Sequence, residues 1–252
     1  GEVVEKGGAA QRLRSLYAGS QDARRVYTCL SSTCSDLTVS SSTFAATNTA
    51  LTNALFGLGS AAADTTDKNN IIAWTRGANN VANDAKDLGP GGTITVRPSI
   101  HGDVLHSRPA VVNYGPTGSN NIVVFYGTND GMLRAVNGNQ TAAYSGVGAG
   151  EEFWSYIPQE HFPKLKRLRD NSPEVKLSTS SSTSSTPRDY FVDGPIGLYQ
   201  KINSGGTSDK VILYVGMRRG GRTLYAIDVT NIAVTKVIWK KTPSDTGMSK
   251  LG

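Results

Sequence analysis

Residues Ile122–Asn137 have the sequence IVVFYGTNDGMLRAVN, in which two apolar runs flank a short turn that contains Asp-Gly. Asp-Gly between two such runs is the usual signal of a β-hairpin. A second stretch, Val211–Val229, has the sequence VILYVGMRRGGRTLYAIDV and repeats the order of apolar run, glycine-bounded turn and apolar run. The two hairpins predict that the chain contains a repeated β unit.

The repeat extends beyond the hairpins on both sides. We predict four strands in each unit. The first strand is expected in His106–Val112 of the first unit and in Phe191–Pro195 of the second. Four antiparallel strands in about 40 to 50 residues is the pattern of a β-propeller blade. The anchors match at nearly constant spacing: Pro109 with Pro195, Leu133–Asn137 with Leu224–Asp228, and Trp154 with Trp239.

We therefore predict a mainly β chain with a partial β-propeller in residues 97–252, whose blades span about 104–157 and 190–241. The runs Ile122–Phe125 and Val211–Leu213 are apolar without alternation, which predicts strands covered on both faces. Because propellers have about 4 to 8 blades, two blades leave the ring open.

Residues 1–96 are rich in Ala, Ser, Thr, Asn and Gly and predict a mixed segment of short helices and loops. The sequence leaves open whether this segment packs on the propeller or completes its last blade through Val26–Thr28. It begins without an initiator methionine or an apolar signal core, so we expect a processed or internal piece of a longer protein.

A basic helix is expected between the blades, over residues 158–170, followed by a mobile Ser/Thr linker over 177–187. The helix carries the densest basic cluster of a chain with 26 Lys and Arg against 20 Asp and Glu. We predict that this cluster binds a partner. Its members are Lys164, Lys166, Arg167 and Arg169.

The net charge of +6 raises nucleic acid or another anionic polymer as a partner. The excess is diffuse, however, and no aromatic platform alternates with the charges as single-strand binding requires. We therefore expect no nucleic-acid partner. The longest uncharged aliphatic stretch also falls short of the roughly 20 residues of a membrane span, so none is predicted.

Cys29 and Cys34 are the only cysteines, and no second pair or nearby histidine suggests zinc. We predict that they form a small disulfide loop in an oxidising compartment, with two reduced thiols as the alternative.

Two groups of polar residues have the residue types of a ligand site. His101, Asp103 and His106 could offer a metal two imidazoles and a carboxylate, but their spacing cannot place all three on one strand face. A structural role is therefore favoured. Asn129–Gly131 is read as a turn rather than a carboxylate ligand loop. No nucleophile elbow or phosphate loop is present, and we predict no catalytic site.

The sequence resembles the C-terminal domain of the PilC/PilY family of type IV pilus tip factors over nearly its whole length. The sequence motifs on which the resemblance rests are Gly7–Arg14, Arg97–Pro109, Tyr126–Leu133, Glu152–Pro158, Tyr190–Gly194 and Gly220–Thr230. The resemblance implies a modified quinoprotein-like propeller without enzymatic activity that acts in pilus biogenesis, surface adhesion and twitching motility.

The resemblance also implies partners and a location. Minor pilins at the pilus tip and a host or abiotic surface are the expected partners, and the expected location is the cell surface, pilus tip or outer membrane after export through the periplasm. Family members carry an Asp-rich calcium loop, but residues 1–252 contain no D-x-D-x-[DN] run. We therefore expect calcium only in the full-length protein, outside this segment.

A quinoprotein dehydrogenase is the alternative from another class, since the L-x-A-[VI]-[ND] phrase and the blade tryptophans also occur in that superfamily. Such an enzyme would bind pyrroloquinoline quinone with calcium in a complete ring and use an aspartate base. The sequence shows neither the remaining blades nor an evident carboxylate cluster.

Overall fold

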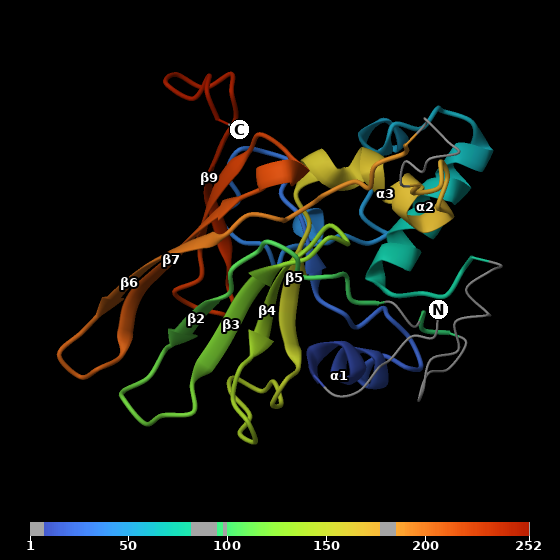
Figure 1. The fold of residues 1–252 in the computed structure, drawn as a ribbon. Coiled ribbons are helices and arrows are strands. Elements are labelled where there is room, and N and C mark those ends of the chain that lie inside the picture. Colours follow the sequence, from blue (N-terminus) through green and yellow to red (C-terminus); the bar gives the residue numbers. More distant parts are fainter. Residues whose placement is uncertain (1–7, 82–94, 98–99, 177–184, 252) are drawn as a thin grey trace.

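The computed structural model describes residues 8–81, 95–97, 100–176 and 185–251. Its β strands form two sheets that lie side by side (Figure 1). The first sheet has the order β1-β5-β4-β3-β2, and the second has the order β6-β7-β8-β9. The strands of the first sheet are β1 (Val26–Tyr27), β2 (Ala110–Asn113), β3 (Ile122–Gly127), β4 (Leu133–Asn137) and β5 (Glu152–Tyr156). Those of the second are β6 (Ile196–Ile202), β7 (Ser208–Gly216), β8 (Leu224–Asp228) and β9 (Lys236–Lys241).

Each sheet contains the four consecutive antiparallel strands of one predicted unit. The registers repeat as well: Gly127 pairs with Leu133 in the first sheet, and Gly216 pairs with Leu224 in the second. Both sheets also carry a register shift between the third and fourth strands, at Ala135 and at Ala226. The repeat seen in the sequence is therefore a repeat of strand pairing.

The two sheets pack through one face each and share a single hydrophobic core. Val123, Phe125 and Trp154 of the first sheet lie in the same cluster as Leu213 and Val215 of the second. The sheets do not close into a ring, which is the partial propeller that the sequence predicts.

Two details of the strand prediction are wrong. The first strand of the second unit is β6, which starts at Ile196, after the predicted stretch Phe191–Pro195. That stretch instead packs on the first sheet, where Val192 meets Gly127. The strand β7 is also not covered on both faces: Val211 and Leu213 are buried, whereas Tyr214 is 37% exposed on the other face.

The N-terminal segment pairs with the outer edge strand of each sheet and so connects the two sheets. Strand β1 pairs in parallel with β5 and adds a fifth strand to the first sheet. Farther along, the backbone of Cys34 exchanges two hydrogen bonds of 2.9 Å with Val237 in β9. Cys29 and Cys34 form a disulfide within this connection. The segment therefore extends the first blade and bridges to the second.

The helices gather at one end of the sheets, except for α1, which lies lower, beside β5 (Figure 1). Phe44, Phe56 and Phe162 pack together with ring centroids 5.0 to 6.1 Å apart and hold α3 against the N-terminal segment. The predicted basic helix begins with a 3-10 turn and continues as α3, with Pro163 in its first turn. Residues 177–184 of the predicted linker lie outside the described residues. The helices are α1 (Gly8–Leu16), α2 (Ala62–Arg76) and α3 (Phe162–Asp170), and the 3-10 turns are η1 (Ser40–Ser42), η2 (Asn53–Phe56), η4 (Gln159–His161) and η5 (Arg218–Gly220).

Candidate functional site: the charged loop end

Four connections of the two sheets meet at one end of the molecule, which we call the loop end. They are residues 100–109 before β2, 128–132 between β3 and β4, 185–195 before β6, and 217–223 between β7 and β8. In Figure 1 the opposite connections β2–β3, β4–β5 and β6–β7 point downward, away from it. His106 Nδ1 lies 2.8 Å from Asp193 Oδ2 and joins the two units at this end.

The charged side chains are distributed very unevenly between the two ends. The opposite connections, at residues 114–121, 138–151, 203–207 and 229–235, contain a single charged residue, Glu151. Loops on a rigid scaffold are where binding residues concentrate, so the loop end is the candidate functional face. Its titratable and charged residues are His101, Asp103, His106, Arg108, Asp130, Arg188, Asp189, Asp193, Arg218, Arg219 and Arg222.

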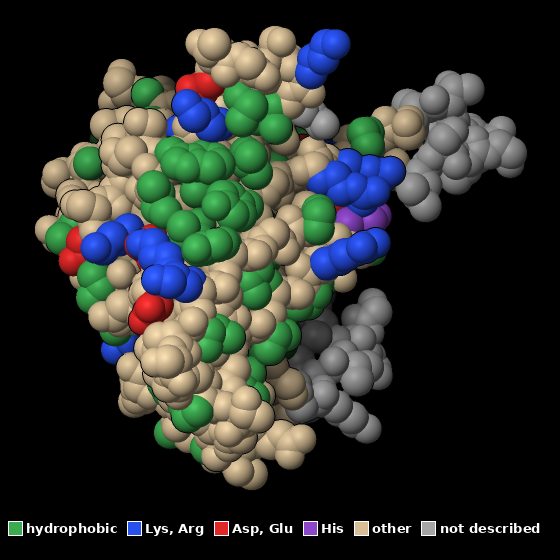
Figure 2. All heavy atoms as spheres, turned by 90° about the vertical axis from the view of Figure 1, so that its left-hand side faces the viewer, with side chains coloured by type: hydrophobic (Ala, Val, Ile, Leu, Met, Phe, Trp, Pro, Cys, Tyr) green, Lys and Arg blue, Asp and Glu red, His purple; other side chains and the backbone are tan. Residues whose placement is uncertain are grey.

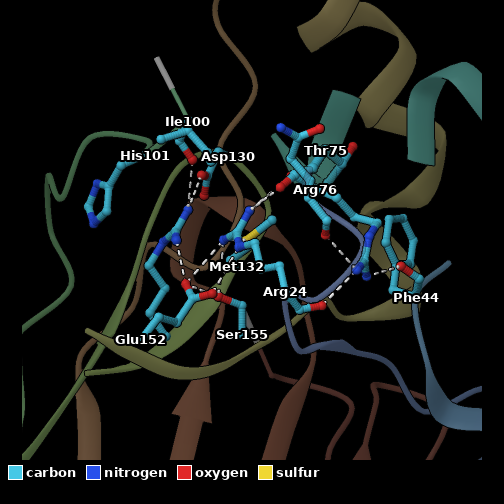
Figure 3. Close-up of polar contacts among 12 residues, drawn as sticks. Arg24, Phe44, Thr75, Arg76, Ile100, His101, Asp130, Met132, Glu152 and Ser155 are labelled. Carbon is cyan, nitrogen blue, oxygen red and sulfur yellow. Dashed lines mark hydrogen bonds and ion pairs between the residues drawn. The ribbon is translucent and has the colours of Figure 1, made fainter. Parts of the chain in front are cut away.

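A buried ion network lies beneath the loop end, on the face of the first sheet that points away from the second sheet (Figure 3). Glu152 accepts hydrogen bonds from Arg24 Nε at 2.9 Å and from Arg134 Nη1 at 2.7 Å. Arg134 also pairs with Asp130 of the β3–β4 turn. All four side chains are at most 5% exposed, so two positive and two negative charges are buried together.

The network ties the N-terminal segment to the sheet. Arg24 Nη1 donates a 2.9 Å hydrogen bond to the carbonyl oxygen of Arg76, the last residue of α2. Arg76 in turn donates from Nη2 to the carbonyl of Arg24 at 2.7 Å and from Nη1 to that of Phe44 at 3.0 Å (Figure 3). These bonds place guanidinium groups at carbonyls of the helix end and of the adjacent loop, which are otherwise unsatisfied acceptors.

Charge pairing keeps the carboxylates of this network ionised. Burial alone would raise the pKa of Glu152, but Arg24 and Arg134 outweigh it and hold that pKa at about 2. Burial would likewise raise the pKa of Asp130, and Arg134 again holds it below its ordinary value. Buried charges that lack such partners would be strongly destabilising, so the network depends on every member.

The side chains of His101, Asp103 and His106 do not come together as a metal site. His101 Nε2 lies 2.8 Å from the Tyr126 hydroxyl, Asp103 accepts two hydrogen bonds from Arg188, and His106 pairs with Asp193. Among the described residues, no three His, Cys, Asp or Glu side chains are grouped as metal ligands. Burial and the nearby Arg134 lower the pKa of His101 to about 4, so its ring is neutral at neutral pH.

The Asn129–Gly131 stretch forms the predicted turn, with Gly131 at a φ of +104°. Its side chains have further partners that the sequence pattern does not reveal. Asn129 accepts a hydrogen bond from the backbone N–H of Phe191 and donates one to Asp193, while Asp130 joins the ion network. The turn therefore links the first unit to the segment that enters the second.

The four cations of the predicted partner-binding cluster have partners within the chain. Lys164 donates hydrogen bonds to the carbonyls of Tyr190 and Gly220 at 3.1 and 2.7 Å. These bonds connect two segments of the loop end. The other three pair with carboxylates of α2, of α3 and of the segment before β6. Lys166 and Arg169 pair with Asp67 and Asp170, and Arg167 pairs with Asp189.

The fold and the loop end together define a β-propeller repeat protein with charged connections at one end of its blades. The family model of the PilY1 beta-propeller domain matches residues 113–246. The chain belongs to this family.

Curated relatives agree with this assignment. The chain is 26% identical over 178 residues to the type IV pilus biogenesis factor PilY1 homolog of Xylella fastidiosa, and 29% identical over 175 residues to the type IV pilus biogenesis factor PilY1 of Pseudomonas aeruginosa strain UCBPP-PA14. These matches cover 62% and 60% of this chain but 13% of each relative. No solved structure matches the chain significantly. None of the described helices has the length and hydropathy to cross a bilayer.

Replacing Glu152 with Gln should destabilise the protein by about 3 to 5 kcal/mol, because Arg24 would lose its carboxylate partner and Asp130 alone would remain to balance the two buried arginines. Urea unfolding followed by circular dichroism measures this loss. The adjacent Glu151 is the matched control, since it pairs with the exposed Arg12, and Glu151→Gln should cost under about 1 kcal/mol. Equal losses for the two variants would show that the network does not stabilise the fold.

Acid should destabilise the protein through its buried histidines. Burial lowers the pKa of both His101 and His161 to about 4, so both stay neutral in the folded protein. In the unfolded chain they take up protons near pH 6.5, so the free energy of unfolding falls as the pH drops from about 6.5 to about 4. Each histidine should contribute about 2 kcal/mol of this loss between about pH 7 and about pH 5.

The variant His161→Phe removes one of these groups from a fully buried position beside the Phe191 ring. Its unfolding free energy, measured in urea at both pH values, should fall by about 2 kcal/mol less than that of the wild type. An unchanged pH dependence in this variant would exclude His161 as a source of the acid sensitivity.

Proposed function

We propose that the protein acts in type IV pilus biogenesis and that its propeller units form a rigid binding platform without catalytic turnover. The observation that carries the proposal is the family match over residues 113–246, which coincides with the two stacked sheets. The relatives named as type IV pilus biogenesis factors support it.

The loop end is the part of this platform that we assign to partner binding. Its connections combine charged side chains with exposed aliphatic ones, since Val104 and Leu105 are 42% and 51% exposed beside His106. Apolar groups surrounded by charges are typical of protein contact surfaces. A minor pilin at the pilus tip is the partner that the family resemblance favours, and surface adhesion and twitching motility would follow from that assembly at the cell surface.

Deleting the gene should reduce the number of surface pili and abolish twitching, and the wild-type gene should restore both. Pili are counted by electron microscopy, and sheared pilin is quantified by immunoblot. A deletion strain with normal pili and motility would contradict the proposed function.

Complementation with Leu105→Asp tests the loop end in the same strain. This variant should restore piliation less well than the wild type while reaching the same protein level, because the side chain is exposed. Thr141→Asp, an exposed position at the opposite end, should complement fully. Equal complementation by both variants would contradict the assignment of partner binding to the loop end.

A further inference from the structure

The surface of the loop end carries an excess of positive charge. Its four connections contain five arginines and four aspartates. Two of the aspartates, Asp130 and Asp193, are buried, and the other two each form an ion pair with an arginine. Figure 2 shows Lys and Arg side chains gathered beside a histidine at one margin of the molecule. A partner that approaches this end therefore meets mainly guanidinium groups.

Two of these arginines contact the same aromatic ring. The Cζ atoms of Arg188 and Arg219 each lie 5.3 Å from the ring centroid of Tyr190. A guanidinium group within about 6 Å of a ring is attracted to its π electrons, so Tyr190 holds two positive charges near each other. The charge of Arg188 is balanced by Asp103, to which it donates hydrogen bonds of 2.7 and 2.9 Å. The charge of Arg219 is not balanced in this way.

Arg218 and Arg219 are both exposed and have weak partners within the described part of the chain. Arg219 Nη1 donates a hydrogen bond of 3.3 Å to the Tyr190 hydroxyl, and no carboxylate of the described residues forms an ion pair with it. Arg218 Nη1 lies 3.9 Å from Asp193 Oδ2, an oxygen that already contacts His106 at 2.8 Å. Because guanidinium groups bind carboxylates through two parallel hydrogen bonds, both arginines can accommodate a carboxylate from outside the chain.

The residues around these arginines favour a protein segment over a uniform polyanion. Asp103 and Asp189 are partly exposed among the arginines and would repel the closely spaced phosphates of a nucleic acid. Val104 and Leu105 add exposed apolar surface beside them. Arginine and aromatic side chains are enriched in protein interfaces, where apolar contacts lie next to separate charge pairs. A segment that combines carboxylates with apolar side chains fits this surface.

We propose that Arg218 and Arg219 bind carboxylates of an acidic segment in a partner protein, and that Tyr190 and Leu105 contact apolar side chains of the same segment. The inference rests on the assignment of partner binding to the loop end in the proposed function, and it adds the chemistry of the partner. Each carboxylate would balance a positive charge that Tyr190 or Asp193 only partly compensates.

Binding of a fluorescent random copolymer of glutamate and tyrosine to the complete gene product tests this proposal. Fluorescence anisotropy in about 0.15 M salt gives the dissociation constant. The test variant combines Arg218→Gln with Arg219→Gln. The matched control combines Lys201→Gln with Lys236→Gln, which removes the same charge from two exposed positions near the opposite end of the strands. A fluorescent oligothymidylate is the comparison ligand.

The arginine variant should bind the copolymer at least about tenfold more weakly than the wild type, and the lysine variant less than about twofold more weakly. Circular dichroism identifies a variant that fails to fold, in which case Arg219→Gln alone decides, with an expected loss of about threefold or more.

Three results would overturn the proposal. They are a wild-type protein that does not bind the copolymer, equal losses for the two double variants, and tighter binding of oligothymidylate than of the copolymer. Because the readout is binding by purified protein, each of these results would remove the acidic partner without affecting the count of surface pili that tests the pilus function.

Discussion

The close approach of the second unit to Gly127 is the constraint on which the rest of the structure depends. The carbonyl of Val192 occupies the space that any larger side chain at position 127 would need. This approach brings Phe125 and Trp154 into one core with the second sheet and sets the distance across which His106 meets Asp193. The packing of the first sheet against the second therefore determines the geometry of the loop end.

The other face of the first sheet is covered in a different way. There the N-terminal segment buries Arg24 against Glu152 and Arg134, where a neighbouring blade would offer apolar side chains. Replacing a buried ion network with apolar residues often leaves stability unchanged or raises it, so its main effect is to fix one arrangement of the segment. The first sheet thus has two dissimilar faces, and only one of them resembles a blade junction.

Local patterns in the sequence predict much of this fold. The hairpin Ile122–Asn137 and its repeat are marked by β-branched runs and turn glycines, so four of the nine strands that the structure describes, β3, β4, β7 and β8, follow from these short-range signals. The sequence does not predict the position of β6, because Gly197 and Gln200 interrupt its apolar pattern. The pairing of Arg24 with Glu152 spans 128 residues and depends on the tertiary fold, so no spacing rule reveals it. The internal contacts of Lys164 with Gly220 and of Lys166 with Asp67 likewise join residues far apart in the chain, so the sequence does not reveal them. That the basic cluster binds a partner stays a prediction.

Comparing Gly127→Ala with Gly216→Ala measures the central contact most directly. In urea unfolding of this chain, Gly127→Ala should lose about 3 kcal/mol or more, because the new methyl group must displace the backbone of Val192. Gly216→Ala should change the free energy of unfolding by less than about 1 kcal/mol, since its Cβ would meet only an ordinary contact. Equal and small effects of the two substitutions would contradict the face-to-face packing of the two units.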